Sequence, residues 1–158
     1  MSRDVKNFFV EDEVVIREMI KKMIPWEQYG FELAGEASDG EMALPLILKS
    51  KPDLLITDIK MPFMDGLTLC KLVKKELPDI KIVILSGYDD FNYAKQAISI
   101  GVEDYLLKPI TKNAFMSVWR RFIIVMNMRR RRRNIMRNSN WKCRSMRGMR
   151  AVISLNLW

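Results

Sequence analysis

The sequence contains no histidine, and this absence removes several kinds of chemistry. Without histidine the chain cannot assemble a Ser-His-Asp hydrolase site, supply the most common zinc ligand or carry phosphohistidine. Its two cysteines, Cys70 and Cys143, are too few for a disulfide framework, which suits a reducing compartment. No apolar run reaches the length of a membrane span, and the N-terminus lacks a signal-peptide pattern. We therefore expect a cytoplasmic protein.

Acidic residues are missing from the last third of the chain. All 19 Asp and Glu residues lie between Asp4 and Asp104. Residues 1–111 carry 14 Lys and Arg, giving 14 − 19 = −5, whereas residues 112–158 carry 13 Lys and Arg and no acid, giving +13. The net charge of +8 is therefore the sum of an acidic part and a basic tail, which have to be interpreted separately.

Apolar runs alternate with amphipathic stretches along the acidic part. The predicted strands are 5–10, 31–37, 53–58, 80–86 and 103–107, and the predicted helices are 13–24, 39–50, 66–77, 89–100 and one from about Thr111. Pro45 is unfavourable inside the second of these helices. Five repeats of strand and helix predict an α/β fold, a doubly wound parallel sheet with helices on both faces. The expected type is the flavodoxin-like (βα)5 fold with strand order 2-1-3-4-5.

Polar side chains collect where the predicted strands end. In chain order these are Glu11, Asp12, Asp58, Ser86 and Lys108. Each is unremarkable alone, since an aspartate after a strand is commonly a helix cap. In the expected strand order, however, Glu11, Asp12 and Asp58 converge, and carboxylates packed together recruit a cation such as magnesium. A carboxylate beside a metal, an ammonium group and a hydroxyl can accept a phosphoryl group.

Four motifs occur in order at characteristic spacings: "VEDE" (10–13), "DIKMPFMDG" (58–66), "LSGYDDF" (85–91) and "DYLLKP" (104–109). With them the sequence resembles the receiver domains of two-component response regulators, most of all those attached to AraC-type DNA-binding domains. The resemblance covers about residues 4–117. We therefore expect a receiver domain over residues 1–117, followed by a basic tail over residues 118–158 that is disordered after a helical stretch ending near Met128.

The resemblance implies a role for each residue that matches a family motif. Asp58 matches the phosphorylated aspartate, and Asp12 matches the direct magnesium ligand. Glu11 matches the acidic neighbour that holds metal-bound water. The main-chain carbonyl of Lys60 matches the third protein ligand of the magnesium ion, beside Asp12 and Asp58.

Three further residues match the part of the family site that responds to phosphorylation. Lys108 matches the lysine that pairs with the phosphoryl oxygens, Ser86 the switch hydroxyl and Tyr105 the switch aromatic. The implied partner is a sensor histidine kinase that brings phosphohistidine to Asp58. The receiver would catalyse its own phosphorylation and slow dephosphorylation, but act chiefly as a switch.

The switched face of the family consists of the fourth helix, the fifth strand and the fifth helix, and it often forms homodimers. Here the sequence departs from the family pattern after about Ser117, which argues against a dimer. Residues 118–158 are too few for an AraC-type domain. DNA would therefore be bound through an output domain that is missing here, and we expect the chain to be a truncated or altered response regulator.

The first predicted strand also departs from the pattern, because Asn7 interrupts an aliphatic run that belongs in the centre of the sheet. A buried amide without a hydrogen-bond partner costs about 1–3 kcal/mol. We expect this residue to lower the stability of the domain without changing its identity.

The basic tail has two competing interpretations. It contains five consecutive arginines and three of the four tryptophans, so it could bind nucleic acid or an acidic membrane. The chain would then be a nucleic-acid-binding protein with the receiver as scaffold, whose binding weakens steeply with salt and ignores Asp58. The other interpretation is a shifted reading frame.

A haloacid-dehalogenase-type phosphatase is disfavoured as an alternative for the Asp58 site, because it needs a second acid where Lys60 stands.

The reading-frame hypothesis makes a direct prediction about the coding DNA. A GAA codon for glutamate, read in another frame within a GAA repeat, becomes AGA for arginine or AAG for lysine. Translation of the two other frames over the tail should therefore reveal a continuous helix rich in Glu and Lys. If neither frame contains such a helix, the hypothesis is rejected.

Overall fold

The computed structural model describes residues 4–87, 91–128, 131–132 and 135–136. Its named elements are β1 (Val5–Val10), α1 (Val14–Met23), the 3-10 helix η1 (Trp26–Tyr29), β2 (Phe31–Ala37), α2 (Gly40–Ser50), β3 (Leu54–Asp58), α3 (Gly66–Glu76), β4 (Lys81–Ser86), α4 (Phe91–Ile100) and β5 (Asp104–Leu107). A further helix covers residues 112–128. The chain divides into two compact units, residues 1–118 and 119–158, and all named elements belong to the first.

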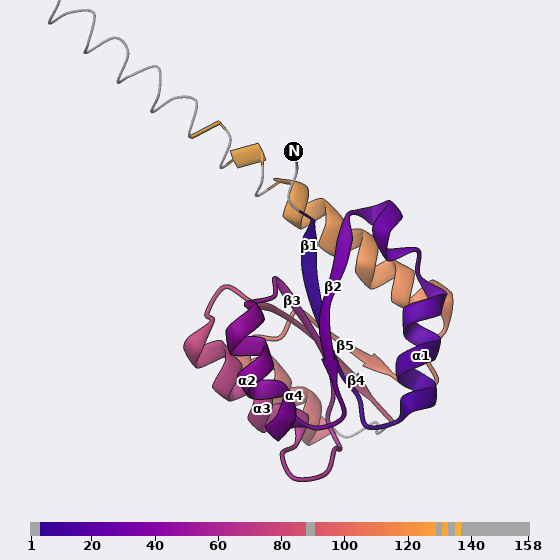
Figure 1. Ribbon diagram of the computed structural model, residues 1–158, viewed down its shortest axis with the longest axis vertical. Helices are drawn as coiled ribbons and strands as arrows, with labels where there is room; N and C mark the ends of the chain where they lie inside the picture. The colour runs from indigo at the N-terminus through magenta and orange to yellow at the C-terminus, as the bar shows by residue number, and fades with distance from the viewer. Residues whose placement is uncertain (1–3, 88–90, 129–130, 133–134, 137–158) are drawn as a thin grey trace, which may run out of the picture. The chain divides into compact units, whose positions relative to one another are not determined.

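The five strands form one parallel sheet in the order β2-β1-β3-β4-β5, which confirms the predicted flavodoxin-like topology. In Figure 1, α2, α3 and α4 lie on one face of this sheet and α1 on the other. The observed strands and the first three predicted helices begin and end within one residue of the predicted limits, because continuous apolar runs and amphipathic stretches are local signals. The 3-10 helix η1 was missed, since four residues between Pro25 and Gly30 are too short to show a period.

Helical structure differs from the prediction near the end of the chain. Residues 131–132 and 135–136 are helical, beyond the expected end near Met128. The disorder predicted after that point falls largely on residues 137–158, which lie outside the described residues. The first two residues of the predicted helix 89–100 also lie outside them.

Two aspartates begin the helices on the α2–α3 face. Asp39 Oδ1 accepts a hydrogen bond from Met42 N at 2.8 Å, and Asp65 Oδ1 accepts one from Thr68 N at 2.8 Å. These N-cap bonds satisfy backbone donors that a helix leaves open. Pro45 does not interrupt α2, which runs continuously from Gly40 to Ser50.

The pairing of β1 with β2 contains a bulge. Asn7 pairs with Leu33 but Phe8 pairs with Gly35, so one residue of β2 is left without a partner in the register. A Cβ atom on Gly35 would lie 2.6 Å from Cε2 of Phe8. Glycine at this position therefore allows the Phe8 ring to enter the core, where it is 1% exposed.

Asn7 lies in the middle of β1 and is 1% exposed. Its backbone is paired with both β2 and β3, but neither Oδ1 nor Nδ2 of its side chain has a hydrogen-bond partner. The structure thus places a buried amide without a partner where the sequence predicted a departure from the aliphatic pattern. Burial of such a group opposes folding.

We predict that Asn7→Val stabilises the protein by about 1–3 kcal/mol, because valine is apolar and favours strands. Urea unfolding followed by circular dichroism measures the change. The exposed Asn113→Val serves as the control and should shift stability by no more than about 0.5 kcal/mol. Equal or lower stability of Asn7→Val would show that the amide is satisfied in solution.

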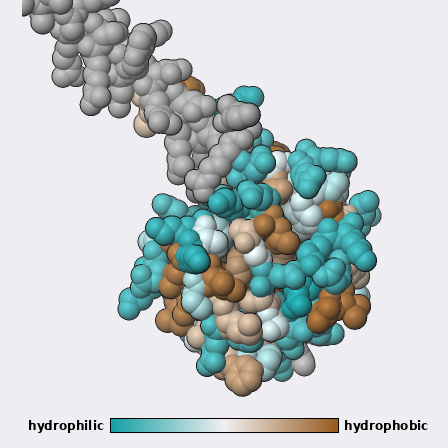
Figure 2. Space-filling view, viewed as in Figure 1, coloured by the Kyte–Doolittle hydropathy of each residue, from teal (hydrophilic) through white to brown (hydrophobic). Residues whose placement is uncertain are grey.

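Apolar side chains also reach the surface. On α1 the exposed fractions are 57% for Val14, 79% for Val15 and 41% for Met19. Figure 2 shows brown, apolar surface over the regions of α1 and α2, separated by hydrophilic surface. None of the helices in the described residues is both long enough and apolar enough to span a membrane.

Candidate functional site

Three carboxylates meet at the carboxyl edge of the sheet. Glu11 and Asp12 directly follow β1, and Asp58 is the last residue of β3. Because β1 and β3 are neighbours in the sheet, one carboxylate oxygen from each of these residues lies within 4.8 Å of the other two. Glu11 and Asp58 are buried whereas Asp12 is exposed, so the cluster opens to solvent on one side. The predicted convergence of the three acids is confirmed.

Lys108 supplies the positive charge of this cluster. Its Nζ lies 3.0 Å from Asp58 Oδ2 and 3.0 Å from Glu11 Oε2. The backbone N–H of Lys108 donates to Ser86 O at 2.7 Å, which ties the end of β5 to the end of β4. The Lys108–Pro109 peptide bond is cis. Lysine thus bridges two carboxylates that would otherwise repel each other.

The balance of charge in the cluster remains negative, with three carboxylates and one ammonium group. Burial raises the pKa of Glu11 to about 7, and the nearby Asp58 carboxylate adds to this rise, while Lys108 only partly offsets it. Burial opposes the charge on Lys108, but its hydrogen bonds to Asp58 and Glu11 prevail and raise its pKa. The site therefore has an excess of negative charge that a further cation would relieve.

The donor set fits a hard divalent cation. The three acids offer only oxygen ligands, and the exposed Asp12 leaves room for the water molecules that magnesium retains. Asp58 Oδ1 accepts a hydrogen bond from Ile59 N at 2.6 Å, which orients the carboxylate. Glu11, Asp12 and Asp58 could hold such an ion together.

The other predicted site residues lie on β4, on β5 and in the loop after β3. Ser86 is fully buried at the end of β4, one residue beyond Leu85, the register partner of Asp58. Lys60 is exposed two residues after Asp58, and its Nζ lies 6.0 Å from the centre of the Tyr93 ring. Tyr105 is half-buried on β5 and packs against the hydrophobic core.

The loop between β3 and α3 folds tightly against Asp58. Gly66 N donates to Ile59 O at 2.8 Å, and a Cβ atom on Gly66 would lie only 1.8 Å from the main-chain oxygen of Asp58. Any larger residue would push the loop away from Asp58. An Asp-Gly pair is a common turn signal and does not reveal such a close approach, so the sequence analysis missed this contact. In the same loop Phe63 has a positive φ of 66° and is 84% exposed.

Sequence reasoning also missed Arg17 of α1. Its Nη1 donates to the main-chain oxygen of Glu11 at 2.5 Å. The only signal was spacing, since Arg17 follows Glu13 by one helical turn and therefore lies above the acidic turn.

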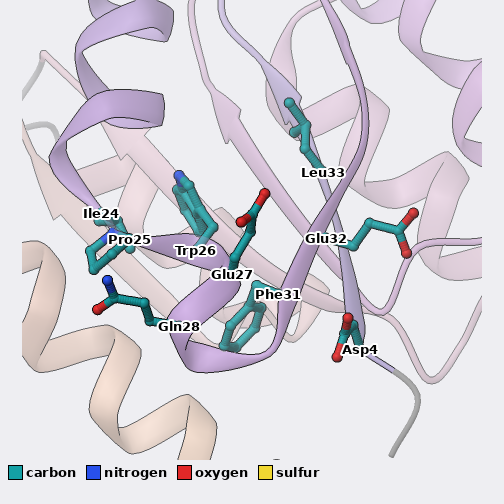
Figure 3. Close-up of a pocket in the computed structure, with 9 residues that line it drawn as sticks. All are labelled: Asp4, Ile24, Pro25, Trp26, Glu27, Gln28, Phe31, Glu32 and Leu33. Carbon is teal, nitrogen blue, oxygen red and sulfur yellow. The ribbon is translucent and has the colours of Figure 1, made fainter.

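A groove of about 810 Å³ lies at the amino ends of β1 and β2, away from the acidic cluster at the carboxyl ends of the strands. Figure 3 shows the residues that line it. Its side chains come from η1 and the neighbouring strand starts: Asp4, Ile24, Pro25, Trp26, Glu27, Gln28, Phe31, Glu32 and Leu33. None of the predicted site residues lines this groove.

The raised pKa of Glu11 predicts how stability depends on pH. The folded protein holds a proton on Glu11 up to about pH 7, whereas the unfolded chain releases it near the ordinary value of 4.5. In the absence of metal, the contribution of Glu11 to folding stability should therefore fall as pH rises from about 4.5 to about 7. Urea unfolding in EDTA across this range measures it.

Glu11→Gln should remove that part of the pH dependence, because glutamine does not titrate. Glu32→Gln, at an exposed position, is the matched control and should keep the wild-type profile. Identical pH profiles for Glu11→Gln and wild type would contradict the assignment.

The sequence matches the family model of the response regulator receiver domain over residues 8–120. An uncharacterized response regulatory protein of Staphylococcus epidermidis is 48% identical over 105 residues, which cover 66% of this chain and 41% of that protein. The uncharacterized transcriptional regulatory protein YesN of Bacillus subtilis is 40% identical over 112 residues, covering 71% of this chain and 30% of YesN. The chain thus spans well under half the length of these relatives.

Solved structures agree with the family match. The REC domain of AraT, a response regulator from Geobacillus stearothermophilus, has a TM-score of 0.75 and 39% sequence identity, covering 80% of this chain and 98% of that domain. A response regulator receiver domain from Clostridium thermocellum has a TM-score of 0.69 and 28% identity, covering 78% and 98%. The chain belongs to the response regulator receiver family.

Proposed function

We propose that this chain is the phosphoacceptor receiver of a two-component response regulator and that Asp58 is the residue phosphorylated. The observation that carries the proposal is the cluster of Glu11, Asp12 and Asp58 with the ammonium group of Lys108 at 3.0 Å from Asp58. A nucleophilic carboxylate, a set of metal ligands and a fixed cation are the parts that phosphoryl transfer requires.

The donor is phosphohistidine on a partner sensor histidine kinase. A carboxylate oxygen of Asp58 forms a bond to phosphorus as the phosphorus–nitrogen bond breaks, and the imidazole leaves with the bonding electron pair. Lys108, whose Nζ lies 3.0 Å from Asp58 Oδ2, would pair with the transferred oxygens. Asp12, Asp58 and the Lys60 carbonyl would hold magnesium, with Glu11 acting through water. A bound magnesium ion would neutralise negative charge on the phosphoryl group.

The phosphorylated site then acts on its neighbours. The Ser86 hydroxyl would move toward the new phosphoryl oxygens, and Tyr105 would turn inward into the space that this movement opens. Both residues lie on adjacent strands, β4 and β5, so the change would reach α4 and the helix over residues 112–128. Such a local charge event can bias a two-state element, which makes the domain a switch.

The surface beside the site offers a place for the kinase. Val14, Val15 and Met19 expose apolar area on α1, which begins two residues after Asp12. A protein partner that buries these side chains would bring its phosphohistidine to the edge where Asp58 lies.

DNA binding is a separate question. YesN is named a transcriptional regulatory protein, as is HptR of Staphylococcus aureus, which is 47% identical over 100 residues. DNA binding by this chain would need an output domain. The alternative, binding of nucleic acid through the arginine run, rests mainly on residues outside the described part. Homodimerisation through α4, β5 and the following helix also stays a prediction.

The proposal is tested by incubating the full chain with acetyl phosphate and magnesium and measuring its intact mass. We expect a gain of one phosphoryl group that requires both Asp58 and magnesium. Asp58→Asn should show no gain. Asp79→Asn removes a carboxylate from an exposed loop and should be phosphorylated like the wild type.

Circular dichroism on each variant separates loss of the site from loss of the fold. A wild-type chain that is folded but gains no mass would contradict the proposal. Phosphorylation of Asp58→Asn to the same extent as wild type would assign the phosphoacceptor to another residue.

A further inference from the structure

Arg17 connects the first helix to the turn that carries two of the three acids. Its side chain is only 13% exposed, and its Nη1 donates a hydrogen bond to the main-chain oxygen of Glu11 at 2.5 Å. The guanidinium group therefore holds the backbone from which Glu11 and Asp12 project. Arginine can do this while keeping its remaining donors for a second partner.

That second partner is Glu36 on β2. Arg17 Nε lies 3.8 Å from Glu36 Oε2, and Lys21 Nζ lies 2.7 Å from the same oxygen. Lys21 also pairs with Glu18 at 2.5 Å. Glu36 is thus paired with two cations of α1, and the ion pair with Arg17 links the guanidinium group to β2 without a hydrogen bond to Nε.

Other contacts also reach the acidic turn, including ion pairs of Lys108 Nζ with Glu11 Oε2 at 3.0 Å and with Glu13 Oε1 at 3.9 Å. Glu11 N donates to Ala37 O at 3.1 Å, and Glu13 N donates to Glu11 Oε1 at 3.2 Å. The N-cap residue of α1, Glu13, makes no side-chain cap hydrogen bond. Lys108 contacts carboxylates of the turn, whereas Arg17 Nη1 donates to a main-chain oxygen, so Arg17 acts on the backbone of the turn itself.

We propose that Arg17, braced by Glu36, is a positioning residue that holds Glu11 and Asp12 in the arrangement that binds a divalent cation. This inference rests on the proposed function, because it requires that the acid cluster binds magnesium. Arg17 would act through the backbone of the turn rather than by touching the ion. Outer contacts of this kind change metal affinity by about 10–100-fold.

The direction of the effect separates positioning from simple electrostatics. Removing a positive charge near three carboxylates should tighten the binding of a cation, because less repulsion remains. Removing a brace should weaken binding, because the carboxylates must be ordered when the ion arrives. A purely structural role for Arg17 would lower folding stability and leave the affinity for magnesium unchanged.

The test is calorimetric titration of the full chain with magnesium, alongside urea unfolding in EDTA. We expect Arg17→Met to weaken magnesium binding by about tenfold or more. Arg17→Lys should recover part of the loss, since lysine can reach one of the two partners but not both. Lys22→Met is the matched control, because Lys22 is exposed on the same helix, and it should bind magnesium at least as tightly as wild type.

Glu36→Gln and the double variant extend the test. Because Glu36 acts through Arg17, the double variant should lose no more affinity than Arg17→Met alone. If Arg17→Met does not fold, Arg17→Lys and Glu36→Gln still test whether Arg17 positions the acids for magnesium binding. Unchanged or tighter magnesium binding in folded Arg17→Met, or in both Arg17→Lys and Glu36→Gln, would overturn the inference while leaving the proposed function intact. Absence of magnesium binding in the wild type would overturn both.

Discussion

The ammonium group of Lys108, 3.0 Å from carboxylates of both Glu11 and Asp58, is the interaction on which the site depends. It joins the ends of β1, β3 and β5, although β4 lies between the last two. Neighbouring strands are about 4.8 Å apart, so the lysine has to reach across one strand, which its long side chain allows. The parallel order of the sheet brings these charges together. Lys108 reduces the repulsion between the carboxylates but does not neutralise the negative charge of the cluster. What remains is an excess of acidic groups that could hold a cation.

Tight backbone contacts keep that arrangement in place. Gly66 lies so close to the main-chain oxygen of Asp58 that a side chain would displace the loop. On the other side of the cluster, Arg17 holds the carbonyl of Glu11. The acids therefore project from two short segments whose backbones are each fixed by a contact outside the cluster. Such support is what preorganises carboxylates for metal binding and phosphoryl transfer.

Two buried polar residues, Asn7 in β1 and Glu11 directly after it, differ in whether their side chains have partners. Glu11 is buried with partners, and the cost of its burial appears as a pKa raised to about 7. Asn7 is buried to the same extent without a partner for its amide. The first burial belongs to the site and can be relieved by a cation. The second opposes folding, and nothing in the described structure makes use of it.

The sequence by itself determined the order of strands and helices, because hydrophobic periodicity and caps such as Asp39 are local. It also determined that Glu11, Asp12, Asp58 and Lys108 lie at the same edge of the sheet, because the carboxyl ends of parallel strands all meet at that edge. The short η1 helix escaped prediction because it has no period. Only the tertiary structure decided that Glu11 is buried, that Gly66 presses on Asp58 and that Arg17 braces the acidic turn. These features depend on distances between atoms that meet only when the chain is folded, and hydrophobic periodicity does not encode such distances.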